Sequence, residues 1–281
     1  MTHSPEFEIR EALDYLYEPG QVGELRVLGT KKGTISGYFD DTDKLASAAA
    51  RLSGKASGVY ITPNPVDSTL LARADNRVRE FVRTGESTRD PDILSRRNFL
   101  IDFDAVRPVG VSSTDAEHEA AISRAKQCRQ RLVERGWPVP LLADSGNGAH
   151  LVFRIEMPND DASKELVERC LKALGIEFDD DDVIVDPTTF NASRIWKLYG
   201  TQVRKGDARP DRPYRMASIL EAPEHLAVVP LELLRELAAL APSTKRSKPR
   251  AKVVSSNGAL QGRGDYTTLD MVEWFQSHGC Y

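Results

Sequence analysis

The sequence predicts an α+β fold in which a β–α–β–β–α–β core is flanked by further α/β elements. Short apolar runs, typical of strands, alternate with segments whose apolar residues recur at the three- and four-residue spacing of amphipathic helices. The glycine-rich stretch 144–148 separates two of the apolar runs and predicts a hairpin turn. This order is that of the ferredoxin-like fold, which carries many functions and therefore decides none of them.

The elements before this core are inferred from residue spacing and turn residues. Residues 6–17 and 43–52 predict two helices. Residues 29–37 contain two lysines and three glycines and predict a loop or turn. Residues 58–62, Gly-Val-Tyr-Ile-Thr, predict a strand that ends at Pro63, because proline cannot donate a hydrogen bond to a sheet.

The core itself begins with a strand over residues 99–104 that is apolar except for two aspartates. Thr114 and Glu117 have the spacing of a capping box, which predicts a helix that ends at Gly136. The other strands are expected at 139–143, 149–155, 183–186 and 194–203, and the other helices at 163–174, before Gly175, and at 230–240.

Three parts are expected along the chain. Residues 1–240 hold all the core elements and predict one folded domain. Residues 241–262 begin with a stretch rich in basic residues and proline, which is typical of a flexible linker. Residues 263–281 contain one amphipathic helix, and because one helix cannot fold alone we expect a further C-terminal region to continue from it.

Composition and charge exclude several classes of protein. No apolar run approaches the ~20 residues that cross a bilayer, and the N-terminus lacks the features of a signal peptide, which argues against a membrane or secreted protein. The three cysteines are far apart in the sequence, so we expect no disulfide framework or cysteine zinc site, and a cytoplasmic location. The net charge of −4 argues against bulk binding to nucleic acid. Local basic stretches remain: residues 73–97 hold seven arginines and five acids, and 186–215 hold seven basic and three acidic residues.

Carboxylates at strand ends are the first candidates for chemistry. Asp102 and Asp104 are two residues apart on a predicted strand and so share a face. Two carboxylates on one face repel each other unless a cation lies between them, and Mg²⁺ or Mn²⁺ suits oxygen ligands. Asp186 follows another apolar strand and would be the third ligand of a two-metal site. Alternatively, each acid is a solvated residue at a strand end.

Groups suited to phosphate are the second set of candidates. Ser145, Gly146 and Gly148 form a turn whose backbone amides can approach a phosphate, and His150 follows it. Arg194 and Lys197 bring positive charge close behind Asp186 in the sequence. The alternatives are an ordinary hairpin turn and a solvated basic strand.

Taken together and in order, the motifs apolar-DxD, SGxGxH, apolar-Asp and RxxKLYG over about residues 5–240 resemble the archaeo-eukaryotic primase (AEP) superfamily. The resemblance is greatest to the bifunctional DNA primase-polymerase (prim-pol) domains of phages, plasmids and CRISPR-associated proteins. It implies a catalytic core of two α/β modules, with the active site on the ferredoxin-like, or RRM-like, antiparallel sheet between them. It also implies primase and DNA polymerase activity: nucleotidyl transfer from dNTPs or NTPs on a single-stranded DNA template and primer.

The resemblance also implies residue roles. The three motif aspartates would ligate two Mg²⁺ or Mn²⁺ ions, and His150 would contact the incoming triphosphate. Arg194 and Lys197 would hold that triphosphate, with Lys197 in place of a commoner arginine. Contacts to the backbone of the DNA template would come from Arg96, Arg97, Arg204 and Lys205. A helicase or other domain beyond the linker would supply further contacts.

Two other function classes are compatible with the same residues. An RRM-like module could bind single-stranded nucleic acid without chemistry, although the strand face that would carry its aromatic residues holds Asp102 and Asp104 instead. Another metal-dependent enzyme on the same fold, such as a nucleotide cyclase or a nuclease, is the third possibility. Nucleotide polymerisation separates both from the primase-polymerase interpretation.

Overall fold

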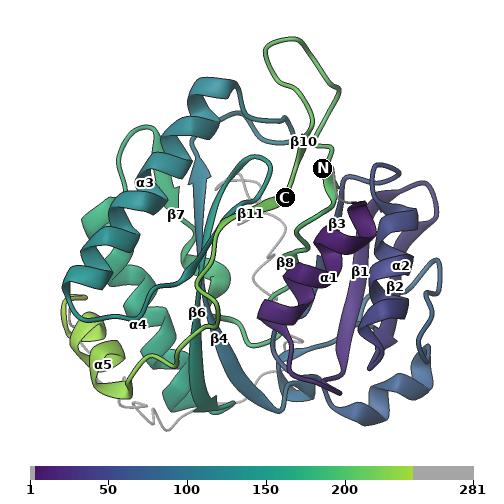
Figure 1. Ribbon diagram of the computed structural model, residues 1–281, viewed down its shortest axis with the longest axis horizontal. Coiled ribbons are helices and arrows are strands. Elements are labelled where there is room, and N and C mark those ends of the chain that lie inside the picture. Colours follow the sequence, from purple (N-terminus) through teal and green to yellow (C-terminus); the bar gives the residue numbers. More distant parts are fainter. Residues whose placement is uncertain (1–3, 243–281) are drawn as a thin grey trace, which may run out of the picture.

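Two antiparallel sheets organise residues 4–242, the part of the chain that the computed structural model describes. The N-terminal sheet has the order β2-β1-β3-β8, and the second sheet has the order β11-β5-β6-β4-β7. Figure 1 shows the N-terminal sheet at the right and the second sheet at the centre, each with its own helices. The strands of the N-terminal sheet are β1 (Gly23–Thr30), β2 (Gly33–Phe39), β3 (Gly58–Ile61) and β8 (Trp196–Lys197). Its helices are α1 (Pro5–Leu16) and α2 (Thr42–Leu52).

The second sheet has the predicted β–α–β–β–α–β core. The elements in chain order are β4 (Ser95–Ala105), α3 (Asp115–Glu134), β5 (Leu141–Asp144), β6 (Gly148–Pro158), α4 (Asp161–Phe178) and β7 (Val183–Val185). Every neighbouring pair is antiparallel, and β6 lies between β5 and β4, as the split βαβ pattern requires. A late strand, β11 (Ser218–Glu221), extends the sheet beside β5. Thr114 and Glu117 form the predicted capping box of α3.

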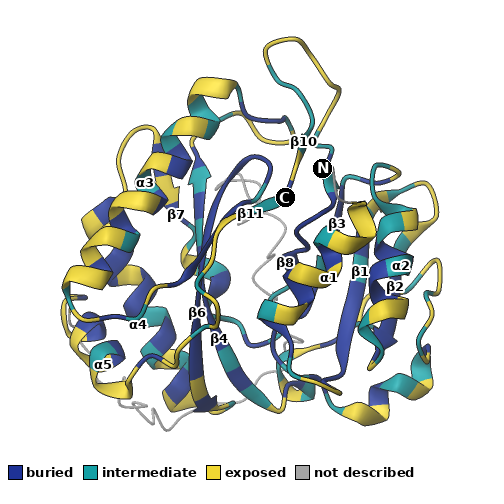
Figure 2. Cartoon of the chain, in the orientation of Figure 1, coloured by how far each residue is buried: buried dark blue, intermediate teal, exposed yellow. Residues whose placement is uncertain are grey.

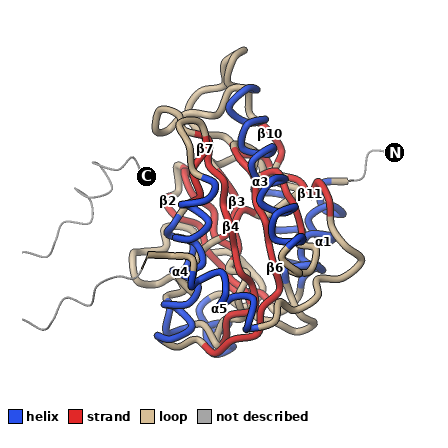
Figure 3. The backbone as a smooth tube through the Cα atoms, turned by 90° about the vertical axis from the view of Figure 1, so that its left-hand side faces the viewer, coloured by secondary structure: helices blue, strands red, loops and turns tan. Residues whose placement is uncertain are grey.

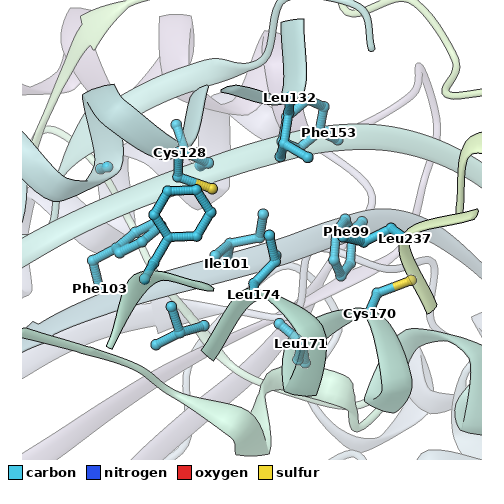
Figure 4. Packing of buried hydrophobic residues seen from close by; sticks show 14 of the residues in the cluster. Phe99, Ile101, Phe103, Cys128, Leu132, Phe153, Cys170, Leu171, Leu174 and Leu237 are labelled. Atoms are coloured by element: carbon cyan, nitrogen blue, oxygen red, sulfur yellow. The ribbon is translucent and has the colours of Figure 1, made fainter. Parts of the chain in front are cut away.

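Helices cover one face of the second sheet, as Figure 3 shows for α3 and α4. Phe99, Ile101 and Phe103 of β4 point into the core beneath these helices (Figure 4), and α5 (Leu231–Ala239) packs on α4. Cys128 and Cys170 lie in the same core as free thiols. Because successive residues of a strand face opposite sides, the residues between these apolar ones face the other way.

The opposite face of this sheet joins the two halves of the molecule. Leu100 of β4 and Val152 of β6 belong to one apolar cluster with Ile9 and Leu13 of α1 and with Val27 of β1. Figure 2 shows the strands around this junction as largely buried. The face that carries Leu100 therefore packs at one end against the N-terminal half, and Asp102 and Asp104 continue the same face.

Two expectations from the sequence about the extent of elements are wrong in detail. Residues 29–37 are mostly strand: β1 and β2 form a hairpin whose turn lies between Thr30 and Gly33. Gly29 and Gly33 have positive φ angles and serve the turn, whereas Gly37 lies within β2, where a Cβ atom would collide with the carbonyl of Arg77. Helix α4 continues past Gly175 to Phe178.

The single strand expected at 194–203 is also wrong. It is divided into β8 and β9 (Gln202–Val203), which pairs with β10 (Arg215–Met216) in a separate two-stranded sheet. Gly200 lies between them at φ +83°, and a Cβ atom there would approach the backbone nitrogen of Ile9 to 2.8 Å. The chain therefore bends at Gly200 to pass close to α1.

Short 3₁₀ helices complete the fold at Ser68–Arg73 (η1), Asp90–Asp92 (η2) and Pro187–Phe190 (η3). Of the expected linker, only residues 241 and 242 are described, and the expected C-terminal region lies outside the described residues. Within the described part, no helix has the length and apolar character needed to cross a membrane.

Candidate functional site

A pocket of about 560 Å³ lies where the two sheets meet, and most of the predicted site residues line it. Strands β4 and β6 contribute from the second sheet, and β3 and β8 from the N-terminal sheet. The predicted residues in its wall are Asp102, Asp104, Ser145, His150, Asp186, Arg194, Lys197 and Lys205. Side chains from five separate stretches of sequence are therefore brought to one place.

Asp102 and Asp104 lie side by side on β4, opposite the turn end of β6. Asp102 pairs in register with His150, and Asp104 pairs with Gly148. Oδ1 of Asp102 is buried and has no hydrogen-bond partner among the described residues, although it lies 3.4 Å from Nε2 of His150. Oδ1 of Asp104 is 3.5 Å from Nη1 of Arg107. Asp102 therefore lacks the donors that usually satisfy a buried carboxylate, whereas the Asp104 side chain is 37% exposed and faces the Arg107 guanidinium.

The two carboxyls differ in their affinity for protons. Burial raises the pKa of Asp102, but His150, Arg194 and Lys205 outweigh it, so the pKa lies below the ordinary value of 3.8. Burial and then the adjacent Asp102 raise the pKa of Asp104, and the opposing effect of Arg107 is smaller. The second negative charge of the pair is therefore disfavoured unless a cation compensates it.

The His150 ring packs against two buried aromatic side chains. Its ring stacks on Trp196 with the centroids 3.8 Å apart, and its Nδ1 lies 3.0 Å from the Tyr199 hydroxyl. That hydroxyl accepts a hydrogen bond of 2.8 Å from Nε1 of Trp196. The hydroxyl proton of Tyr199 then has Nδ1 of His150 as its acceptor, which leaves the proton of a neutral His150 on Nε2, facing Asp102.

Asp186 is placed next to Asp102 through the backbone and next to Arg194 through its side chain. Its amide donates to the carbonyl of Asp102 at 2.9 Å. One carboxylate oxygen accepts hydrogen bonds from the amide and the hydroxyl of Thr188, at 2.8 and 2.7 Å. The other accepts from the guanidinium of Arg194. In this arrangement the negative charge of Asp186 is already compensated.

Lys197 presents an unpaired cation to the pocket. Its Nζ is buried, has no hydrogen-bond partner among the described residues and lies 3.7 Å from the ring centroid of Tyr60. Burial, with a smaller contribution from Lys205, lowers the pKa of Lys197 from 10.5 to about 7. A buried ammonium without hydrogen bonds is costly, and an anionic ligand would supply the missing acceptors.

The fit of a divalent cation rests on Asp102 and Asp104. Within residues 4–242, no group of three or more His, Cys, Asp or Glu side chains is arranged to hold a metal ion. The unpartnered Oδ1 of Asp102 and the adjacent carboxylate of Asp104 are nevertheless hard oxygen donors, which suit Mg²⁺ or Mn²⁺. The third predicted ligand, Asp186, would first have to exchange its contact with Arg194.

Two predicted glycines of the site serve packing. A Cβ atom on Gly148 would lie 2.2 Å from the carbonyl oxygen of Phe103, so only glycine allows β6 to approach β4 here. Gly146 has φ +90°, and its amide donates to Asp144 at 2.6 Å. Neither lines the pocket, whereas Ser145 does, and the Ser145 hydroxyl accepts from the Gly148 amide at 3.0 Å.

Three predicted DNA-binding arginines also lie outside the pocket wall. Arg96 and Arg97 are at the opposite end of β4 from the aspartates, where Arg96 donates to the Phe190 carbonyl at 2.6 Å and Arg97 pairs with Glu18 at 2.8 Å. Arg204 donates to the carbonyl of Gly54 and lies over a tyrosine ring. Lys205, the fourth predicted DNA-binding residue, does line the pocket.

Sequence reasoning missed the residues that close the pocket. Arg107 holds the loop after β4 through the carbonyls of Ala105 and Val111, at 2.9 and 3.3 Å, and faces Asp104. Its position three residues beyond the DxD motif was the available signal. The sequence indicates Tyr60 only as a strand residue. The contact of its ring with Lys197 depends on pairing between β3 and β8, which are distant in the sequence.

Comparison of the chain with protein-family models, with curated proteins and with solved structures finds no match. A functional assignment for this chain therefore rests on the residues and geometry of the pocket.

Proposed function

We propose that this chain is a DNA primase-polymerase with the catalytic core of the archaeo-eukaryotic primase superfamily. The observation that supports the proposal is the meeting, in one pocket, of a carboxylate pair with His150, Arg194 and Lys197. A carboxylate pair suits a divalent cation, and the neighbouring cationic and hydrogen-bonding groups suit a triphosphate. Nucleotidyl transfer needs both kinds of group within one small space.

Each residue has a role in this proposal. Asp102 and Asp104, joined by Asp186, would hold Mg²⁺ or Mn²⁺. Bound there, the ions would lower the pKa of an attacking 3′-hydroxyl and neutralise the leaving pyrophosphate. The protein would position the reactants. His150 would donate a hydrogen bond from Nε2 to a phosphate oxygen, and the buried ammonium of Lys197 would form an ion pair with the triphosphate.

Arg194 can pair either with Asp186 or with a bound triphosphate, so nucleotide binding would change the environment of the carboxylates. In the described structure it compensates Asp186. A triphosphate entering the pocket offers more negative charge than one carboxylate, so the guanidinium would move part of its hydrogen bonding to the phosphates. Asp186 would then be released to join Asp102 and Asp104. The nucleotide and the cations would accordingly bind with positive cooperativity.

The test is product formation on a single-stranded DNA template with labelled dNTPs or NTPs, with and without an annealed primer, in Mg²⁺ or Mn²⁺. We expect template-dependent products that disappear in Asp102→Ala/Asp104→Ala. The exposed Asp43 provides a matched control, since Asp43→Ala should leave synthesis intact. Strand binding without any product would favour the RRM-like binding module, and cyclised or degraded nucleotides without polymerisation would favour another metal-dependent enzyme.

A further inference from the structure

An exposed aromatic ring stands among cations at the outer edge of the N-terminal sheet. Phe81 is 66% exposed, the largest value among the exposed large hydrophobic residues of the described chain. Its backbone has φ +55°, a strained region that a bulky side chain rarely occupies. Phe81 and Asn76 are the only described non-glycine residues with positive φ, and both lie in the segment that runs beside β2.

The position of Phe81 is fixed by hydrogen bonds to the β1–β2 hairpin. Its amide donates to the carbonyl of Lys32 at 3.0 Å, and the amide of Val82 donates to the carbonyl of Thr34 at 2.9 Å. Two residues earlier, Arg79 and Ser36 exchange a pair of backbone hydrogen bonds. The strained residue is therefore held in place rather than left in a free loop, and its ring is kept at the surface.

Exposed basic residues flank Phe81 in its own segment and in the hairpin that it pairs with. The Phe81 surface consists of Lys31, Lys32, Arg77, Arg79, Phe81 and Arg83, all exposed. Within residues 4–242, only Lys32 of these cations has a carboxylate within ion-pair distance, Glu80 at 2.6 Å. A second nearby acid, Glu86, accepts from the amide of Arg83 at 3.0 Å. The surface thus offers unpaired positive charge around an aromatic ring.

This surface lies close to the pocket along the chain. Leu28 of β1 lines the pocket, and Lys31 follows it by three residues, which span at most about 11 Å at 3.8 Å for each Cα step. The Phe81 ring is near Gly33 in the same hairpin, 3.6 Å from where a Cβ atom of that glycine would lie. A strand of nucleic acid would therefore reach the ring and the arginines by crossing β1 and β2 from the pocket.

We propose that the Phe81 surface binds single-stranded DNA outside the pocket, with the ring stacking on a base and the arginines contacting phosphates. An aromatic ring among unpaired cations matches a polyanion that carries flat apolar bases. The choice of a DNA strand as occupant rests on the proposed function, because a template must extend beyond the catalytic pocket.

The experiment measures binding of fluorescent oligodeoxythymidylate by anisotropy at low salt in the presence of EDTA, without nucleotides. Stacking of one base is worth about 1–3 kcal/mol, so Phe81→Ala should weaken binding by roughly five- to 160-fold. Phe81→Gly relieves the backbone strain yet should lose affinity equally, whereas Phe81→Trp should bind as the unmodified protein does. Ile176→Ala, at an exposed apolar residue of α4, is the matched control and should have no effect.

An abasic oligonucleotide of the same length separates stacking from charge. The unmodified protein should bind it more weakly than the thymidylate strand, and Phe81→Ala should weaken that binding no further. Equal binding of both strands, or binding unaffected by Phe81→Ala, would overturn the proposal. Because the assay needs no catalysis, Phe81-dependent binding by a protein that makes no product would refute the polymerase function while leaving the DNA-binding surface intact.

Discussion

Replacing Lys197 with methionine tests whether the burial of this ammonium without a hydrogen-bond partner lowers the free energy of unfolding. Lysine has an ordinary pKa of 10.5, and the pKa is about 7 in this site. At 1.36 kcal/mol for each unit of pKa, burial of this group opposes folding by about 4 kcal/mol at pH 7. Methionine fills similar space without charge but loses the contact with the Tyr60 ring, so Lys197→Met should be more stable at pH 7 by at most about 4 kcal/mol.

The sign of the pH dependence follows from the same two pKa values. Between pH 7 and 10.5 the unfolded chain binds a proton at this lysine that the folded protein does not, so the free energy of unfolding rises with pH. The advantage of Lys197→Met should accordingly shrink over that range. Urea unfolding followed by tryptophan fluorescence at several pH values measures it, with the exposed Lys172→Met as control.

Two outcomes would refute this reasoning about Lys197. One is a Lys197→Met protein that is less stable than the unmodified protein at pH 7. The other is a difference in stability that does not change with pH. A ligand measurement completes the test: inorganic tripolyphosphate should raise the Tm of the unmodified protein, because it supplies the missing acceptors, and should raise that of Lys197→Met much less.

Three further predictions concern the same pocket. Gly148→Ala should lower the free energy of unfolding by about 1–3 kcal/mol, because its Cβ would collide with the Phe103 carbonyl; thermal unfolding measures this, and a Tm within error of the unmodified value would contradict it. Tyr199→Phe should cost about 1–3 kcal/mol in urea unfolding, since it leaves the buried nitrogens of Trp196 and His150 unpaired; a neutral effect would mean that water replaces the hydroxyl. Asp104→Asn should stabilise the metal-free protein increasingly as pH rises above 3.8, because the raised pKa of Asp104 makes its ionisation oppose folding; it should also abolish Mn²⁺ binding in calorimetry.

Local sequence signals were sufficient for most of the second sheet. The capping box predicted α3, the glycine turn predicted the β5–β6 hairpin, and the short strand predicted at 183–186 is β7, which ends one residue earlier. The β1–β2 hairpin was missed because glycines and lysines resemble a loop locally. Both strands are mostly buried in the folded protein, where β1 pairs with β3 and the hairpin packs against α2, so no alternation in the sequence marked them as strands.

Several carboxylates and cations that the sequence indicated line one pocket, whereas the residues that surround them were not indicated. Asp102 and Asp104 could be assigned to one face because strand alternation is a local rule. Arg96 and Arg97 could not be judged, since their burial depends on Phe190 and Glu18, which are far away in the sequence. The same holds for Tyr60 and Arg107, whose positions follow from tertiary contacts rather than from any motif.

Strand β8 has a consequence for how the chain folds during synthesis. The N-terminal sheet is completed by Trp196 and Lys197, about 135 residues further along the chain than Ile61 of β3, to which Trp196 is paired. At about 5–20 residues per second, the ribosome exposes that last strand roughly 7 to 27 seconds after β3. During this interval the edge of β3 lacks its partner and is open to pairing with other chains. Because β8 also carries Lys197, the wall of the pocket is complete only after β8 has paired with β3.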